Sequence, residues 1–90
     1  MDLTSLRCEI DSIDDELIRL FVKRMAVCAQ VADYKKANNL PILMPARELE
    51  KLEDVALKAG PEMADYAKQL YTLLFQLSRD HQARRNEVTP

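Results

Sequence analysis

The segment from Leu3 to Lys35, LTSLRCEIDSIDDELIRLFVKRMAVCAQVADYK, decides the fold of this chain. Apolar residues recur along it at alternating spacings of three and four, which is typical of a long helix packed against other helices. The two rows, together called the seam below, are Leu3, Ile10, Leu17, Arg24 and Val31, and Leu6, Ile13, Leu20, Val27 and Tyr34. Arg24 interrupts the seam at a position where the pattern favours Leu or Val.

Three cations lie on or beside this apolar face. Arg24 belongs to the seam itself, while Arg7 and Lys35 belong to a row that flanks it. Burying a cation costs free energy unless an anionic group meets it. The segment therefore indicates that an anion binds at this face.

The first helix is predicted to start at an N-cap formed by Thr4 or Ser5. It ends near Asn38, because Pro41 disfavours helix in the residue before it. Its ~34 residues would extend for ~50 Å, whereas a compact chain of this size has a diameter of roughly 30 Å. One chain cannot cover such a helix, and a symmetric homodimer is the simplest source of a covering surface.

Two shorter helices are predicted to follow. Pro45 suits a first helical turn, so the second helix spans Pro45–Ala59 and stops at Gly60. The third helix begins near Glu62 and ends around Arg84 or Arg85, since acidic residues favour a helix N-terminus and basic residues a C-terminus. The residues predicted to face inward are Leu49, Leu52, Val55 or Ala56, and Ala59 in the second helix, and Met63, Tyr66 or Ala67, Leu70, Leu73 or Leu74, and Leu77 in the third.

The composition favours a single all-α domain, residues 1–90, with residues 86–90 as a tail or a linker. Of the 90 residues, 48% are apolar and 31% are charged, and only one is Gly. The net charge of -2 argues against a nucleic-acid partner. No apolar run approaches the ~20 residues that span a membrane. No secretory signal is visible, so we expect a cytoplasmic protein.

The cysteine and histidine content argues against a disulfide or a metal site. Cys8 and Cys28 would lie about 30 Å apart on the first helix, and a disulfide requires Cα atoms within roughly 7 Å. The chain has one His and no Cys-x-x-Cys pair. Both cysteines are therefore expected to be small apolar residues of the helix.

Polar residues also interrupt the shorter helices. The third helix has a second stripe of Tyr71, Leu74 or Phe75, Ser78 and Gln82, in which Ser78 and Gln82 stack one turn apart. Arg47 and Glu48 occupy the first turn of the second helix.

Taken singly, each polar residue has an ordinary structural reading. Arg24 could pair with an acidic residue of another chain, and Arg7 could pair with Asp11 or Asp14 along its own helix. Lys35 could be solvated near a helix end, and Glu48 could interact with the dipole at a helix start. Ser78 and Gln82 could form an ordinary polar helix face, and His81 could point to solvent.

Taken together, these residues offer several cations, one carboxylate, one amide and one hydroxyl. We find no nucleophile–base pair, no metal ligands and no phosphate-binding glycine loop in the sequence. Such a set can bind a small dianion that carries a hydroxyl, and it can stabilise negative charge that develops on an oxygen.

The order and spacing of these residues resemble the all-helical chorismate mutases, the AroQ class. The resemblance rests on Arg-x-x-Ile-Asp-x-Ile-Asp-x-Glu-Leu from Arg7 to Leu17, Leu20 and Arg24, Val31-Ala-x-Tyr-Lys35, Pro41 with Pro45-Ala-Arg-Glu48, and Leu77-Ser-Arg-Asp-His-Gln82. It covers essentially Leu6 to Gln82. It implies intertwined homodimers of three helices, in which each of two identical active sites uses residues of both chains.

The resemblance also implies the reaction. Chorismate would rearrange to prephenate by a Claisen-type step, in the shikimate pathway to phenylalanine and tyrosine, with no cofactor and no covalent intermediate. Arg24 would bind one substrate carboxylate, and Arg7 would reach in from the partner chain. Lys35 would bind a carboxylate and the ether oxygen of the breaking bond, and Gln82 would donate to that oxygen from the other side.

The remaining roles are less central. Glu48 would accept a hydrogen bond from the ring hydroxyl, Arg47 would support the loop at the site edge, and Ser78 would lie near a carboxylate. The sequence departs from the family at Met44, where relatives often carry an Asp. A thioether cannot replace a carboxylate, so recognition of the ring hydroxyl is the weakest part of the assignment.

Two other functions and a second organisation remain open at this point. The same fold serves isochorismate–pyruvate lyases, and a silent helical dimerisation or regulatory module would share the seam. The chain could also be the N-terminal part of a larger bifunctional enzyme, for example one with a prephenate dehydratase.

Overall fold

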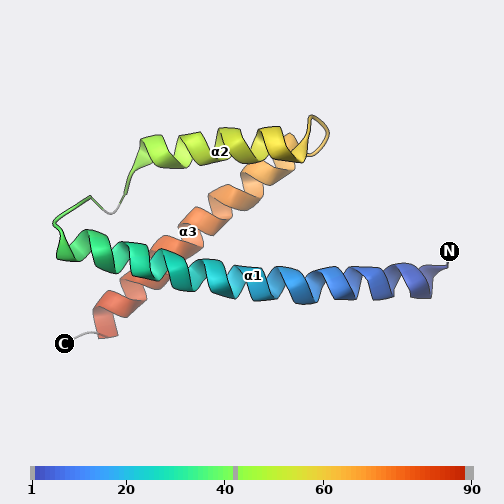
Figure 1. The fold of residues 1–90 in the computed structure, drawn as a ribbon, viewed down its shortest axis with the longest axis horizontal. Coiled ribbons are helices and arrows are strands. Elements are labelled where there is room, and N and C mark those ends of the chain that lie inside the picture. The colour runs from blue at the N-terminus through green and yellow to red at the C-terminus, as the bar shows by residue number, and fades with distance from the viewer. Residues whose placement is uncertain (1, 42, 89–90) are drawn as a thin grey trace.

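The computed structural model describes residues 2–41 and 43–88, without the side chains of 86–88. They form three helices, α1 (Leu3–Ala37), α2 (Pro45–Ala59) and α3 (Ala64–Val88). The predicted all-α class with a long first helix is therefore confirmed. In Figure 1, α3 crosses the C-terminal half of α1 and lies against α2, while the N-terminal half of α1 extends away from both. None of the described helices is long and apolar enough to cross a membrane.

The N-cap of α1 differs from the prediction, whereas the C-terminal end of the helix lies where it was predicted. The N-cap is Asp2, whose Oδ1 accepts a hydrogen bond from the backbone N–H of Ser5 at 2.8 Å. Thr4 and Ser5 therefore lie inside the first turn, and their assignment as caps was wrong. At the other end Asn39 adopts φ 57°, and the N–H of Leu40 donates to the carbonyl of Lys35 at 2.8 Å. This pair of features closes the last turn around Lys35.

The bounds of α2 are those predicted, Pro45–Ala59. Gly60 follows with φ 86°, a value that favours glycine, and its carbonyl accepts a hydrogen bond from the N–H of Met63 at 3.1 Å. This turn delays α3 until Ala64, whereas the prediction began the helix near Glu62.

The C-terminus of α3 also differs from the prediction. The helix continues to Val88 rather than ending around Arg84 or Arg85. Residues 86–88 are therefore helical, although they were assigned to the tail. Residues 89–90 lie outside the described part of the chain.

The three helices bury little within one chain. Of the described side chains, only Ala32, Val55 and Gln82 are buried, with exposed fractions of 8%, 9% and 5%. The molecule measures 54 × 30 × 15 Å and has a radius of gyration of 16.4 Å. A compact chain of this length would have a radius near 12 Å. The extended shape is consistent with a chain that folds against a partner.

The faces that pack inside one chain are only partly those predicted. Leu52, Val55 and Ala56 face inward on α2, but Leu49 and Ala59 are exposed. On α3 the second stripe packs throughout: Tyr71, Leu74, Phe75, Ser78 and Gln82 are half-buried or buried. Of the predicted main apolar face, Ala67, Leu74 and Leu77 are half-buried, whereas Tyr66, Leu70 and Leu73, and Met63 just before the helix, are exposed. The prediction of that face is therefore confirmed only in part for the single chain.

The seam of α1 is also left uncovered. Its apolar members in the C-terminal half, Val27, Val31 and Tyr34, are exposed, and only Arg24 is half-buried there. The helix α3 instead contacts the adjacent face through Met25 and Ala29. Every residue from 2 to 20 is exposed. The rows that define the helix in the sequence are thus available for another molecule.

Candidate active site

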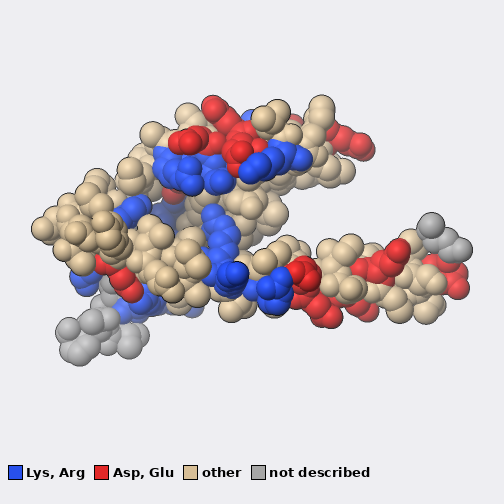
Figure 2. Space-filling model, viewed as in Figure 1, with Lys and Arg blue, Asp and Glu red and all other residues tan. Residues whose placement is uncertain are grey.

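A hollow of about 290 Å³ lies where the three helices meet, and it is called the cationic hollow below. It brings together every predicted site residue except Arg7. Its lining is Arg24, Cys28, Val31, Ala32 and Lys35 from α1, Arg47, Glu48 and Lys51 from α2, and Phe75, Ser78, Arg79 and Gln82 from α3. Figure 2 shows blue Lys and Arg atoms gathered in the gap between α2 and α1, whereas red acidic atoms gather on the N-terminal half of α1.

Arg24 is held in the hollow by aromatic rings. Its guanidinium carbon lies 5.4 Å from the ring centroid of Tyr71 and 5.9 Å from that of Phe75, and Nη1 lies 3.7 Å from Sγ of Cys28. The negative faces of the rings attract the cation without neutralising it. Among the described residues, none of the ion pairs includes Arg24. A half-buried cation held in this way favours an anionic ligand.

Lys35 is fixed by the end of α1. It occupies the last turn of the helix, where its carbonyl accepts the capping hydrogen bond from Leu40. The negative end of the helix dipole favours a cation there. The side chain is half-buried and lines the cationic hollow. The cap thus fixes the backbone of Lys35 at the margin of the cationic hollow.

Glu48 and Arg79 form an ion pair that the sequence did not reveal. Nη1 of Arg79 donates to Oε2 of Glu48 at 2.6 Å and joins α3 to α2. The pair leaves the second carboxylate oxygen of Glu48 as an acceptor site. The partners are 31 positions apart, so no local pattern in the sequence pointed to Arg79.

The edge of the hollow is also basic. Arg47 is exposed and lies 3.6 Å from Glu50, and Lys51 pairs with Asp54 at 3.3 Å. Lys51 was not singled out in the sequence. In total five cationic side chains and one carboxylate line the hollow, so the electrostatics of the site favour an anionic ligand.

The uncharged polar groups come from α3. Ser78 directs its hydroxyl to Sδ of Met25 at 3.7 Å. Gln82 is the most buried polar residue described, and its Oε1 accepts a hydrogen bond from Nη1 of Arg85 at 3.2 Å. Ser78 and Gln82 therefore share one face of α3, as their spacing predicted.

Arg7 lies away from the other site residues. It is exposed on the first part of α1, about 25 Å along the helix from Arg24. Within one chain it cannot reach the cationic hollow.

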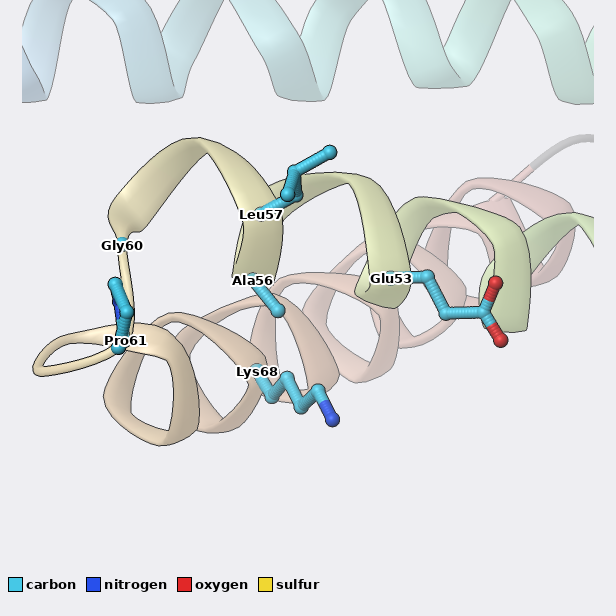
Figure 3. Close-up of a pocket in the computed structure, with 6 residues that line it drawn as sticks. All are labelled: Glu53, Ala56, Leu57, Gly60, Pro61 and Lys68. Atoms are coloured by element: carbon cyan, nitrogen blue, oxygen red, sulfur yellow. The ribbon is translucent and has the colours of Figure 1, made fainter.

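A larger hollow, of about 390 Å³, lies at the turn between α2 and α3 (Figure 3). Its lining is Glu53, Ala56, Leu57, Gly60, Pro61 and Lys68. Its two charged groups, Glu53 and Lys68, have opposite signs and provide no cationic surplus. This hollow therefore lacks the features that would hold a dianion.

The geometry defines the class of the protein. It is an all-helical domain whose site offers cations, one carboxylate and one amide, and within the described residues no cluster of His, Cys, Asp or Glu could hold a metal ion. The chain belongs to the chorismate mutase type II family, which matches residues 6–83. This family comprises isomerases of aromatic amino acid biosynthesis, and the resemblance seen in the sequence is confirmed.

Curated relatives agree with the family assignment. The chain is 47% identical over 57 residues to the T-protein of Haemophilus influenzae, a match that covers 63% of this chain and 15% of that protein. It is 41% identical over 54 residues to a bifunctional chorismate mutase/prephenate dehydratase of Aquifex aeolicus, covering 60% and 15%. It is 35% identical over 80 residues to a protein of the same name from Buchnera aphidicola, covering 86% and 20%.

The relatives are much longer than this chain. The chain spans between 15% and 20% of the length of the curated relatives that it matches. No solved structure shows a significant match to it.

Proposed function

We propose that this chain converts chorismate to prephenate in the cationic hollow. The observation that carries the proposal is the grouping of Arg24, Lys35 and the buried amide of Gln82 around one space. Chorismate is a dianion, and its rearrangement moves negative charge onto the ether oxygen as the C–O bond breaks. Donors fixed around that oxygen lower the barrier without any group transfer from the protein or any cofactor.

Each cation, and the amide of Gln82, binds a different group of the substrate. Arg24 binds one carboxylate, and Lys35 binds the other carboxylate together with the ether oxygen. Gln82 donates to the ether oxygen from the opposite helix. Ser78 lies near a carboxylate at the margin of the site.

The second helix recognises the ring hydroxyl. Glu48 accepts a hydrogen bond from it through the oxygen that Arg79 does not occupy. Arg47 supports the edge of the site. Met44 stands where relatives often carry an Asp, so Glu48 provides this recognition without a second carboxylate.

The site is completed by a second copy of the chain in an intertwined homodimer. The exposed seam and the uncovered residues 2–20 support this assembly, because an apolar helix face of this length requires a covering surface. Leu20 is the middle residue of α1. In a two-fold dimer with antiparallel α1 helices paired about Leu20, Arg7 lies opposite Asp33 of the partner subunit, beside the cationic hollow of that subunit. Arg7 then supplies the remaining cation.

The charge distribution along α1 supports the same arrangement. Residues 2–17 carry six acidic and one basic side chain, whereas residues 18–37 carry five basic and one acidic side chain. Antiparallel pairing brings each acidic half against a basic half of the other chain. Parallel pairing would place like charges together.

The direct experiment follows the loss of chorismate absorbance during incubation with the purified 90-residue chain. We expect turnover to prephenate, and Lys35→Ala is expected to reduce it about a hundredfold or more, since one donor to the developing charge is worth ~3 kcal/mol. Absence of prephenate would overturn the proposal. Release of pyruvate from isochorismate, with little prephenate from chorismate, would instead identify the lyase.

The same experiment tests the organisation of the chain. We propose that residues 1–90 act as one catalytic domain in the cytoplasm, with chorismate and a second copy as the partners. Turnover by the isolated chain supports this organisation. If turnover required a longer polypeptide, the domain would be catalytically dependent on its neighbour.

A further inference from the structure

Arg85 lies one turn beyond Gln82 and outside the lining of the cationic hollow. In the sequence it was read as a basic residue that suits a helix C-terminus. Its Nη1 donates to Oε1 of Gln82 at 3.2 Å. A guanidinium has only donors, so the atom of the amide that faces it must be the carbonyl oxygen. The contact therefore fixes which end of the Gln82 amide points in which direction.

Arg85 is itself held in place by α1. Nη1 shares its two hydrogens among the amide oxygen of Gln82, the carbonyl of Ala29 and Oδ1 of Asp33, each at 3.2 Å, while Nη2 donates to Oδ2 of Asp33 at 2.9 Å. The two parallel bonds to the carboxylate orient the planar guanidinium. The hydrogen bond from Arg85 also lowers the pKa of Asp33, which keeps the carboxylate ionised. These hydrogen bonds to α1 hold the guanidinium of Arg85 beside the amide of Gln82.

The electrostatics of the hollow make this support necessary. Arg24 and Lys35 line the same hollow as Gln82, and their charges attract a carbonyl oxygen. In the absence of Arg85, the amide would turn its oxygen toward these cations. Its NH₂ group would then point away from the substrate, and the donor to the ether oxygen would be lost.

We propose that Arg85 is a positioning residue that holds the Gln82 amide with its NH₂ group toward the cationic hollow. This inference rests on the proposed function for its kinetic consequence, but its structural part stands on the Arg85–Gln82 contact alone. Arg85 acts through Gln82 and does not touch the substrate.

The first test compares two neighbouring arginines. Arg85→Met keeps the aliphatic stem and removes every donor, and Arg84→Met makes the same change at an exposed position. We expect Arg85→Met to lower kcat about tenfold, with KM changed less than about twofold, because the lost donor acts in the transition state. Arg84→Met is expected to have no effect. Arg85→Lys, which keeps the charge but not the fork, is expected to lose less.

The second test measures how the activity of Gln82→Glu depends on pH. Arg85 shifts this profile only if it acts on the side chain at position 82. In Gln82→Glu the carboxyl donates a hydrogen bond only when it is protonated, and Arg85 favours its ionised form. Adding Arg85→Met is expected to move the midpoint of the profile upward by about one pH unit. The other charged groups around position 82 stay the same in both variants: Arg24, Asp33 and Lys35 of α1, Arg47, Glu48 and Lys51 of α2, and Arg79 of α3.

The same midpoint can be measured without activity, by following the ¹³C resonance of the introduced carboxyl during a pH titration. An unchanged midpoint together with unchanged kcat in Arg85→Met would overturn the inference and leave the proposed function intact. A shifted midpoint in a protein that forms no prephenate would overturn the proposed function and leave the positioning of residue 82 intact. If Arg85→Met fails to fold, Arg85→Gln, which removes the charge but keeps a polar side chain, replaces it in the same titration.

Discussion

The two halves of α1 carry the same seam but differ in almost every structural respect. The C-terminal half packs against α3, is capped around Lys35, and lines the cationic hollow. The N-terminal half contacts neither α2 nor α3 in the described chain, and every residue from 2 to 20 is exposed. The apolar residues of the seam are exposed in both halves, so the heptad pattern marks a face that the packing of this chain does not bury. The N-terminal half also holds Arg7, the predicted site residue that lies away from the cationic hollow.

The largest effect is expected from a charged substitution in the seam of the N-terminal half of α1. Ile13 is 63% exposed in the single chain and lies in the middle of the uncovered seam. Ile13→Asp would bury a charge at the proposed dimer interface, so we expect a monomer with activity reduced more than about a hundredfold. Sedimentation equilibrium and the chorismate assay measure the two effects. Gln30→Asp, on α1 but outside the seam, is the matched control, and a dimeric, active Ile13→Asp would contradict the comparison.

A different outcome is expected when the seam is changed in the C-terminal half of α1, which packs against α3. Arg24→Leu restores the apolar row and removes an unpaired cation, so the dimer should be retained or strengthened. Activity should fall about a hundredfold, because a substrate carboxylate loses its partner. Unchanged turnover would favour a silent dimerisation module over an enzyme.

A smaller effect is expected where α2 begins. The N-cap residue of α2 is Met44, which makes no side-chain hydrogen bond there. Met44→Asp supplies an N-cap acceptor and should raise the free energy of unfolding by about 1 kcal/mol. Urea denaturation measures this change, with Met44→Ala as the control. A destabilised Met44→Asp variant would mean that the carboxylate meets an unfavourable contact at the edge of the hollow.

The smallest effect concerns the link between α1 and α3. The hydrogen bond from Arg85 lowers the pKa of Asp33 below its ordinary value of 3.8. Because the folded pKa is lowered, this contact stabilises the fold above about pH 4 and ceases to do so as the pH falls through the folded pKa. Thermal unfolding of the wild type and Asp33→Asn should therefore differ slightly at pH 7, and the difference should shrink as the pH falls through the folded pKa of Asp33. A difference in unfolding temperature that stays constant as the pH falls would have another cause.

Local signals in the sequence predicted the parts of the fold that depend on local chemistry. Pro45 and Gly60 set both ends of α2, and the Asn residues with Pro41 set the end of α1. The N-cap of α1 was misplaced because Asp2, Thr4 and Ser5 are all good caps, and only the hydrogen bond to Asp2 distinguishes them.

The parts that failed depend on contacts between helices. Arg79 and Arg85 look like ordinary surface cations, and their roles follow from Glu48 and Gln82 lying beside them in space. The face of α3 was assigned by hydrophobicity, which would favour Leu70 and Leu73, whereas within the chain the more polar stripe packs. A single sequence does not distinguish a face that packs within the chain from one reserved for a partner.

The central claim is that each site combines Arg7 of one chain with Lys35 of the other. Mixing the inactive variants Arg7→Ala and Lys35→Ala, with unfolding and refolding to exchange subunits, tests it directly. Random pairing makes about half of the dimers mixed, and each mixed dimer contains one intact site of two. We predict recovery of about a quarter of wild-type activity per chain. Activity no greater than the sum of the two separate variants would contradict the shared site.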